Sequence, residues 1–133
     1  MVHWLHRLLA YQRPKGGLLI DAQTIARRAV DFADAKQATD ITMLDLRPLS
    51  AIADYFVICT ANNERQLRAI LKEIDDQLGK EGAPTPRIEG TAETGWILLD
   101  YGDVIIHIFS AEQRAFYRLD KLWQKATPVV VMQ

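Results

Sequence analysis

Cysteine is almost absent from this sequence, and its scarcity narrows the kinds of site that the chain can build. The one cysteine, Cys59, lies in the apolar run YFVIC. A disulfide within the chain is therefore excluded, and so is a metal site built on several cysteines. We interpret Cys59 as a small buried hydrophobe, and the cysteine usage fits a reducing, cytoplasmic compartment.

The sequence also lacks an excess of either charge, and it lacks long apolar runs. Sixteen lysines and arginines face seventeen aspartates and glutamates, so the formal net charge is -1. This balance argues against a wide basic surface, and we expect no sequence-specific binding of nucleic acid. No apolar run approaches the ~18 residues that cross a bilayer, so we expect no membrane-spanning segment.

The length of 133 residues predicts one domain with its own core. We expect an N-terminal extension over residues 1–18, a domain over 19–125 and a C-terminal tail over 126–133. The first twenty residues contain three bases and no acid, a composition that an organellar transit peptide would also show. We favour a loosely ordered extension, because serine is lacking and arginines are few.

Periodicity and capping patterns predict the secondary structure. Asn63 and Gln66 have the spacing of a capping box, and Gly79 stands where a C-terminal cap is expected. The predicted helices span Asp21 to about Ala35, Asn63 to Gly79 and a short segment from Ser110, and the predicted strands span 41–47, 54–60, 87–91, 96–100 and 104–109. The fold class is therefore single-domain α/β, with a mixed sheet of about five strands and helices mainly on one face.

The last two strands are apolar on both faces. Ile105, His107 and Phe109 alternate with a second apolar set along the same strand. Because so few helices would struggle to cover both faces, we expect part of the second face to be an exposed apolar patch for a partner.

The stretch Asp100-Tyr101-Gly102-Asp103 separates these two strands. Two carboxylates could hold a divalent cation, as in a Mg²⁺-dependent nucleotidyltransferase. Such a site also needs a third carboxylate and a phosphate-binding loop, and neither pattern is present. We favour a polar hairpin turn whose residues contribute little to the core, with no metal and no cofactor.

Two further features have both a structural and a functional interpretation. We interpret His107 as a hydrogen-bonded histidine on the sheet, since nothing nearby in sequence would make it a catalytic base. Arg65, Arg68 and Lys72 follow helical spacing opposite the apolar stripe. They predict a solvated face, and a phosphate-binding ridge is the alternative.

Three blocks of the chain resemble one known family. ADYFVICTANNERQLRAI (53–70), GWILLDYGDVIIHIF (95–109) and RAFYRLDKLW (114–123) look like the ribosomal silencing factor family, also called Iojap-like proteins. The resemblance runs from about Asp21 to Trp123, and it departs at Ala61-Asn62-Asn63, where the family often has Gly-Asn-Ser. It implies a nucleotidyltransferase-like fold that has lost the catalytic motif, and hence no enzyme.

The resemblance also implies a function and a set of contact residues. Members bind the large ribosomal subunit through its protein numbered fourteen and hinder joining of the small subunit, which represses translation. Organellar relatives act in large-subunit assembly, which is an alternative here. Carried over by position, the expected contact residues are Trp96, Leu98, Asp100, Tyr101, Asp103 and His107, with Tyr55 as a weaker candidate. Apart from the resemblance, the expected apolar patch on the sheet also predicts self-association, so we expect a homodimer that competes with the ribosomal partner.

Overall fold

The computed structural model describes residues 20–119 and 126–133. Its elements are α2 (Ala22–Ala35), β1 (Thr39–Asp45), β2 (Tyr55–Ala61), α3 (Glu64–Lys80), β3 (Arg87–Thr91), β4 (Trp96–Asp100), β5 (Val104–Ser110), α4 (Ala111–Tyr117) and β6 (Thr127–Met132). The predicted N-terminal extension over 1–18 and the end of the third resemblance block, residues 120–123, lie outside this range. The domain boundaries stay predictions.

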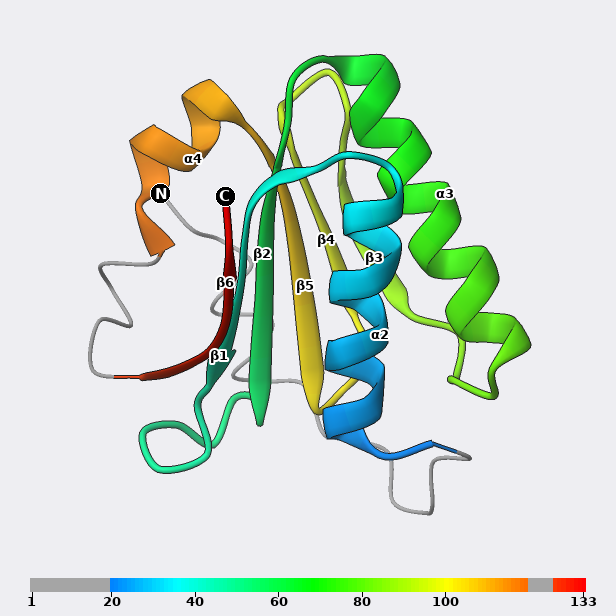
Figure 1. Ribbon diagram of the computed structural model, residues 1–133, viewed down its shortest axis with the longest axis vertical. Coiled ribbons are helices and arrows are strands. Elements are labelled where there is room, and N and C mark those ends of the chain that lie inside the picture. Colours follow the sequence, from blue (N-terminus) through cyan, green and yellow to red (C-terminus); the bar gives the residue numbers. More distant parts are fainter. Residues whose placement is uncertain (1–19, 120–125) are drawn as a thin grey trace.

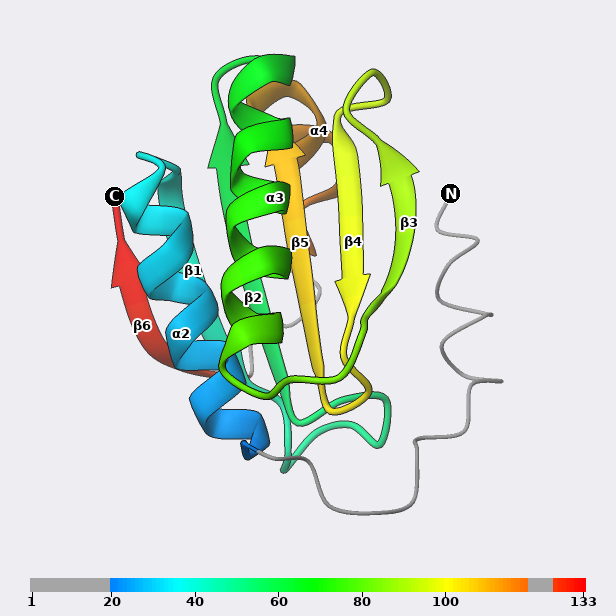
Figure 2. The same ribbon diagram turned by 90° about the vertical axis from the view of Figure 1, so that its right-hand side faces the viewer.

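One mixed sheet, in the order β3-β4-β5-β2-β1-β6, forms the centre of the molecule (Figure 1). Only β2 and β5 pair in parallel, and the other neighbours are antiparallel. The long helices α2 and α3 cover one face, while α4 lies behind the sheet against β5 and β2 (Figure 2). The predicted α/β class with helices mainly on one face is confirmed.

The predicted helix starts are confirmed by side-chain caps. Asp21 Oδ1 accepts a hydrogen bond from the backbone N–H of Thr24 at 2.8 Å, and Asn63 Oδ1 accepts one from Gln66 at 2.8 Å. Ser110 caps α4 in the same way, through the N–H of Gln113. These bonds satisfy backbone donors that the first helical turn leaves without partners.

The predicted end of α3 at Gly79 was wrong. The helix continues to Lys80, and Glu81 is its C-cap. The residue that needs glycine is Gly82, whose φ is +101° and which lets Ala83 N–H return to Leu78 O at 2.9 Å. Left-handed backbone favours glycine at the position after a helix, so the prediction chose the wrong one of two nearby glycines.

The predicted strand count is one short. Residues 127–132 of the predicted tail form β6, which pairs antiparallel with β1. Three consecutive valines favour extended backbone. Pro128 lies near the start of this edge strand, beside a register irregularity in its pairing with β1, and these are positions where strands tolerate proline.

The expected exposed apolar patch on the second face is absent from the described structure. Phe56, Ile105 and Phe109 are at most 1% exposed and belong to a second core cluster. Tyr117 of α4, together with Leu119 and Ala126 beyond it, packs in this cluster. The sheet therefore has an apolar core on each face, because α4 and the segments that follow it contribute side chains to the second one.

Candidate functional site

The β4–β5 hairpin is a tight turn, and the side chain of Asp100 stabilises it. Tyr101 N–H donates to Val104 O at 2.9 Å, and Gly102 adopts a φ of +89°. Asp100 Oδ1 accepts the Gly102 N–H at 2.7 Å in a buried position. This side-chain bond replaces a backbone bond within the turn, so the predicted hairpin turn is confirmed.

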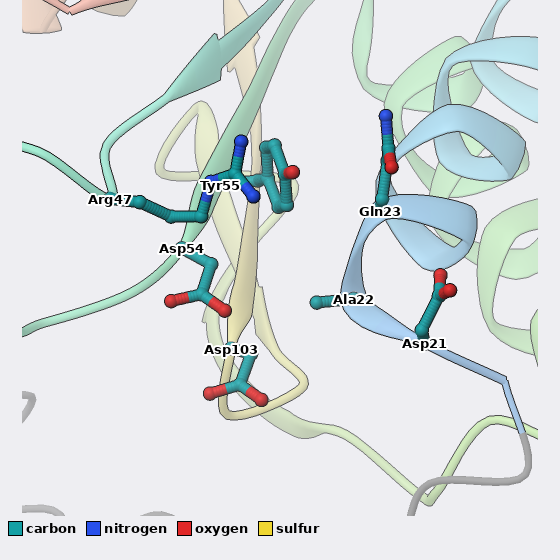
Figure 3. Close-up of a pocket in the computed structure, with 7 residues that line it drawn as sticks. All are labelled: Asp21, Ala22, Gln23, Arg47, Asp54, Tyr55 and Asp103. Atoms are coloured by element: carbon teal, nitrogen blue, oxygen red, sulfur yellow. The ribbon is translucent and has the colours of Figure 1, made fainter.

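Asp103 joins this turn to the start of β2. Its carbonyl oxygen accepts the N–H groups of Asp54 at 2.8 Å and Tyr55 at 3.1 Å. Its side chain lines a cavity of about 450 Å³, with residues of α2 on the opposite wall (Figure 3). We call this cavity the acidic pocket; its lining residues are Asp21, Ala22, Gln23, Arg47, Asp54, Tyr55 and Asp103.

The acidic pocket has an excess of negative charge. The one cation among its described lining residues is Arg47. Arg47 donates from Nε and Nη2 to Asp45 at 3.0 and 2.7 Å and lies 5.3 Å from the centre of the Tyr55 ring. These hydrogen bonds lower the pKa of Asp45. Three carboxylates line the pocket, and a fourth, Asp45, already pairs with its guanidinium group, so the pocket favours a positively charged group.

On the second face, His107 is the centre of an aromatic cluster. Trp96 Nε1 donates to His107 Nδ1 at 3.2 Å, and the Phe56 ring meets the imidazole edge-on at 4.7 Å. Burial, with a smaller contribution from the positive charge of Arg114, lowers the pKa of His107 to about 3. A neutral ring that accepts at Nδ1 carries its proton on Nε2. His107 is thus buried and hydrogen-bonded, as the sequence predicts.

Arg114 is a residue that sequence reasoning missed. From α4 it donates to the Asp40 carbonyl, to Thr60 Oγ1 at 3.1 Å and to Thr42 Oγ1 at 3.4 Å. It thereby fastens α4 to β1 and β2. No local pattern reveals this contact, since its partners lie at least 54 positions away in the chain.

The structure does not bring the seven predicted contact residues together on one surface. Trp96, Leu98, Asp100 and His107 alternate with residues of the helix-covered core, which places them on the second face. Only Trp96 and Asp103 are partly exposed. The buried ones are Tyr55 (3% exposed), Leu98 (4%), Asp100 (3%), Tyr101 (3%) and His107 (0%). The expectation that turn residues contribute little to the core was wrong for Asp100 and Tyr101.

The basic residues of α3 form a solvated face, as predicted. Arg68 contacts Glu64 at 3.3 Å and Glu93 at 2.5 Å, and Lys72 Nζ contacts Asp76 at 2.7 Å. Acids therefore neutralise both cations, which removes the main support for a phosphate-binding ridge.

Two classes of site find no support in the part of the chain that the structure describes. No group of three or more histidine, cysteine, aspartate or glutamate side chains is placed to hold a metal ion there. Asp103 lines the acidic pocket while Asp100 does not, so the two carboxylates do not converge on it. Among the same residues, no helix has the length and apolar character needed to cross a membrane.

Comparison with known proteins gives consistent matches. The family model described as "Ribosomal silencing factor during starvation" matches residues 20–133. A ribosomal silencing factor of Bacillus subtilis is 40% identical over 107 residues, covering 80% of this chain and 91% of that protein. The mouse protein "Mitochondrial assembly of ribosomal large subunit protein 1" is 33% identical over 97 residues, covering 71% and 42%. A crystal structure of a Chromobacterium violaceum protein has a TM-score of 0.75 at 25% identity, covering 84% of this chain and 94% of that one.

Proposed function

This chain belongs to the ribosomal silencing factor family, and we propose that it silences by binding the large ribosomal subunit so that the small subunit cannot join. The family match over residues 20–133 carries the proposal. The proposed contact is the large-subunit ribosomal protein numbered fourteen. The mechanism is steric, because a protein of this size on the joining surface would occupy space that the small subunit needs, and translation falls as a result.

The acidic pocket supports a contact with a basic partner. Proteins that bind ribosomal RNA carry many lysines and arginines, whose charge complements the pocket. A basic side chain entering it would meet Asp54 and Asp103, which are half-buried, beside the ring of Tyr55. Opposite charges speed the encounter, and a partly desolvated ion pair then adds to the affinity.

The exposure of their side chains divides the proposed contact residues into two groups. We propose that Asp103 and Trp96 touch the partner directly, because both are accessible. Trp96 and Asp100 lie at opposite ends of β4, about 13 Å apart at the usual rise per residue. The proposed surface therefore extends along β4. Within this conformation the remaining residues shape that surface from below; they are Tyr55, Leu98, Asp100, Tyr101 and His107.

Sedimentation through a density gradient tests this function. The protein is mixed with isolated large subunits, small subunits and joined ribosomes. We expect it to migrate with large subunits alone and to reduce the number of joined particles as its concentration rises. No migration with any particle would refute the proposal.

A matched pair of charge reversals tests the pocket. Asp103→Lys should weaken binding to large subunits at least tenfold, a loss of about 1.4 kcal/mol, because it replaces attraction by repulsion. Asp34→Lys makes the same change on the exposed end of α2, twelve residues beyond Ala22, and should leave binding unchanged. Equal binding by both variants would move the contact away from the acidic pocket.

Assembly of the large subunit is the second candidate function. The similarity to the mouse protein named for assembly of the mitochondrial large subunit favours it. The same gradient separates the two candidates, since an assembly factor would migrate with large subunits without reducing their joining.

We propose that the protein is not an enzyme and acts in the cytoplasm. The rival interpretation as a Mg²⁺-dependent nucleotidyltransferase needs converging carboxylates, and no such group occurs among the described residues. Calorimetry with a nucleoside triphosphate and Mg²⁺ is the direct test, and measurable binding would revive that interpretation.

We propose a homodimer as well, but the second face of the sheet does not support it. An exposed apolar patch was expected to hold two copies together, whereas the large apolar side chains of that face are buried. A dimer therefore needs a different surface.

A further inference from the structure

The acidic pocket contains a cation of its own, and this cation engages groups that a basic partner would otherwise use. Asp45 and Tyr55 face each other in the β1–β2 register, and Tyr55 lines the pocket. Arg47 follows β1 and reaches back to both of them, and Figure 3 shows its guanidinium group beside the Tyr55 ring. We propose that Arg47 is a built-in competitor, whose charge lowers the affinity of the acidic pocket for a basic partner.

The guanidinium group of Arg47 is held by two kinds of contact that proteins use to bind cations. Its Nε and Nη2 donate to the two carboxylate oxygens of Asp45, in the paired geometry that makes such hydrogen bonds strong. It also lies over the Tyr55 ring at 5.3 Å, within the range of a cation–π contact. The backbone N–H of Arg47 donates to the same carboxylate at 3.0 Å, which keeps the pair together. A cation from a partner would therefore find both groups already engaged.

The charge of Arg47 also acts on the carboxylates that line the pocket. Asp45, first through its hydrogen bonds and then through its charge, raises the pKa of Arg47, and the charge of Asp54 adds to this increase. The guanidinium group is therefore positive at any ordinary pH and lies in the field of a pocket carboxylate. Because like charges repel, Arg47 weakens the attraction of Asp54 and Asp103 for a second cation.

Stability alone does not account for this arrangement. The Arg47 side chain is 59% exposed, and exposed ion pairs contribute little to the free energy of unfolding. Its contacts lie at one end of β1 and β2, unlike those of Arg114, which fasten a helix to the sheet. A repulsive group beside an attractive one is a known route to specificity. Charge alone is then not enough for tight binding, and contacts such as the one proposed for Trp96 must contribute.

Substitution of Arg47 should raise the affinity for large subunits, an expectation that rests on the proposed contact between the acidic pocket and a basic partner. A cavity of about 450 Å³ is roughly 9 Å across, and at that separation in a solvent-accessible site one unit charge changes the binding of another about threefold. Arg47→Gln removes this repulsion and leaves the Asp45 carboxylate to the partner. Its dissociation constant should therefore be lower by about threefold or more. Arg47→Lys keeps the charge and should restore a value close to that of the wild type.

Arg65→Gln is the matched control. It removes an exposed arginine near the start of α3, at the opposite end of β2 from Tyr55, and should leave the dissociation constant unchanged. The gain in Arg47→Gln should shrink as KCl is raised from about 50 to about 300 mM, because salt screens exposed charges, whereas a changed shape would not respond to salt. Unchanged or weaker binding by Arg47→Gln, an equal gain in Arg47→Lys or Arg65→Gln, or a gain that ignores salt would each overturn the inference.

A probe that needs no ribosome separates this inference from the proposed function. Tetralysine is titrated onto the isolated protein, and the backbone amide signals of Tyr55 and Asp103 in nuclear magnetic resonance spectra report its binding at the pocket. Arg47→Gln should bind tetralysine about threefold more tightly than the wild type, and adding Asp103→Lys should remove this gain. If the gain with tetralysine is found but the wild type binds no large subunit, the ribosomal function alone is refuted. If the wild type binds large subunits and Arg47→Gln gains in neither assay, the role of Arg47 alone is refuted.

Discussion

Protonation of His107 should destabilise the fold as the pH falls from 7 to 5. The imidazole is fully buried, accepts a hydrogen bond from Trp96 and has a pKa lowered to about 3. In the unfolded chain a histidine has a pKa of about 6.5. Between these two pKa values the unfolded state binds a proton that the folded state does not. The stability that the neutral ring contributes is therefore complete above pH 6.5 and is lost as the pH falls toward 3.

The size of this effect follows from the two pKa values. At pH 7 the histidine of the unfolded chain is mostly neutral, whereas at pH 5 it is almost fully protonated. Linkage then gives a loss of about 2 kcal/mol in the free energy of unfolding between pH 7 and pH 5. This is a substantial part of the ~5–15 kcal/mol that holds a typical domain folded.

The pH window isolates His107 from the acidic residues. Asp45, Asp76 and Glu81 have pKa values lowered by hydrogen bonds to Arg47, Lys72 and Arg28, respectively. Their stabilisation is present above their unfolded values of about 4 and is lost only as the pH falls below them. They therefore contribute little between pH 7 and pH 5.

Urea unfolding at pH 5, 6 and 7 measures this loss of stability, with His107→Phe as the matched variant. The wild-type midpoint should fall by about 1 M urea from pH 7 to pH 5, while the variant should lose most of this dependence. His3 and His6 are common to both proteins, so the difference between the two reports on His107. Equal pH dependence in both would refute the burial argument.

Four further substitutions test the backbone at two glycines, the contacts of Arg114 and the acidic pocket. Gly79→Ala should stabilise the chain by about 0.5–1 kcal/mol, because a Cβ on α3 meets no atom within 4 Å. Gly95→Ala should destabilise it by about 1–3 kcal/mol, because φ is +79° and the Cβ would lie 2.6 Å from Ser110 Oγ; thermal unfolding compares the two. Arg114→Met should lower the free energy of unfolding by about 2 kcal/mol, since the Asp40 carbonyl and two threonine hydroxyls lose their donor. The backbone amides of α4 should then exchange faster with solvent. Asp103→Lys should leave the melting temperature near that of the wild type, since the substitution keeps the backbone carbonyl that accepts the N–H groups of Asp54 and Tyr55.

Local signals in the sequence predicted much of the fold. Strands β3 and β4 have the predicted bounds, and the caps at Asp21, Asn63 and Ser110 form as expected. In each case the controlling interaction lies within a few residues. Strand β6 was missed because its partner β1 is more than 80 residues away, and a short apolar segment after a helix has no local mark that distinguishes a strand from a tail.

In the candidate site, too, features set by neighbouring residues were predicted, and features set by distant contacts were missed. The turn at Asp100–Asp103 was predicted, because glycine and aspartate favour it locally. The acidic pocket was not, since it depends on the packing of the first turn of α2 against the β2 end of the sheet. Arg114 was missed for the same reason. Burial was misjudged because α4 and the residues after it add a second core that periodicity alone cannot assign to a face.

Substitutions of Tyr101 can separate a contribution to core packing from a direct contact with the ribosomal partner. Its ring belongs to the helix-covered core, and within the described structure its buried hydroxyl has no hydrogen-bond partner. Tyr101→Ala would therefore remove core packing, at a cost of about 3–5 kcal/mol, and weaker ribosome binding by that variant would not identify a contact. Tyr101→Phe keeps the ring and removes only the hydroxyl, so stability should be unchanged or higher. If Tyr101→Phe alone weakens binding, the hydroxyl reaches the partner and the turn must open on binding; if binding is unchanged, Tyr101 acts only by supporting the turn that presents Asp103.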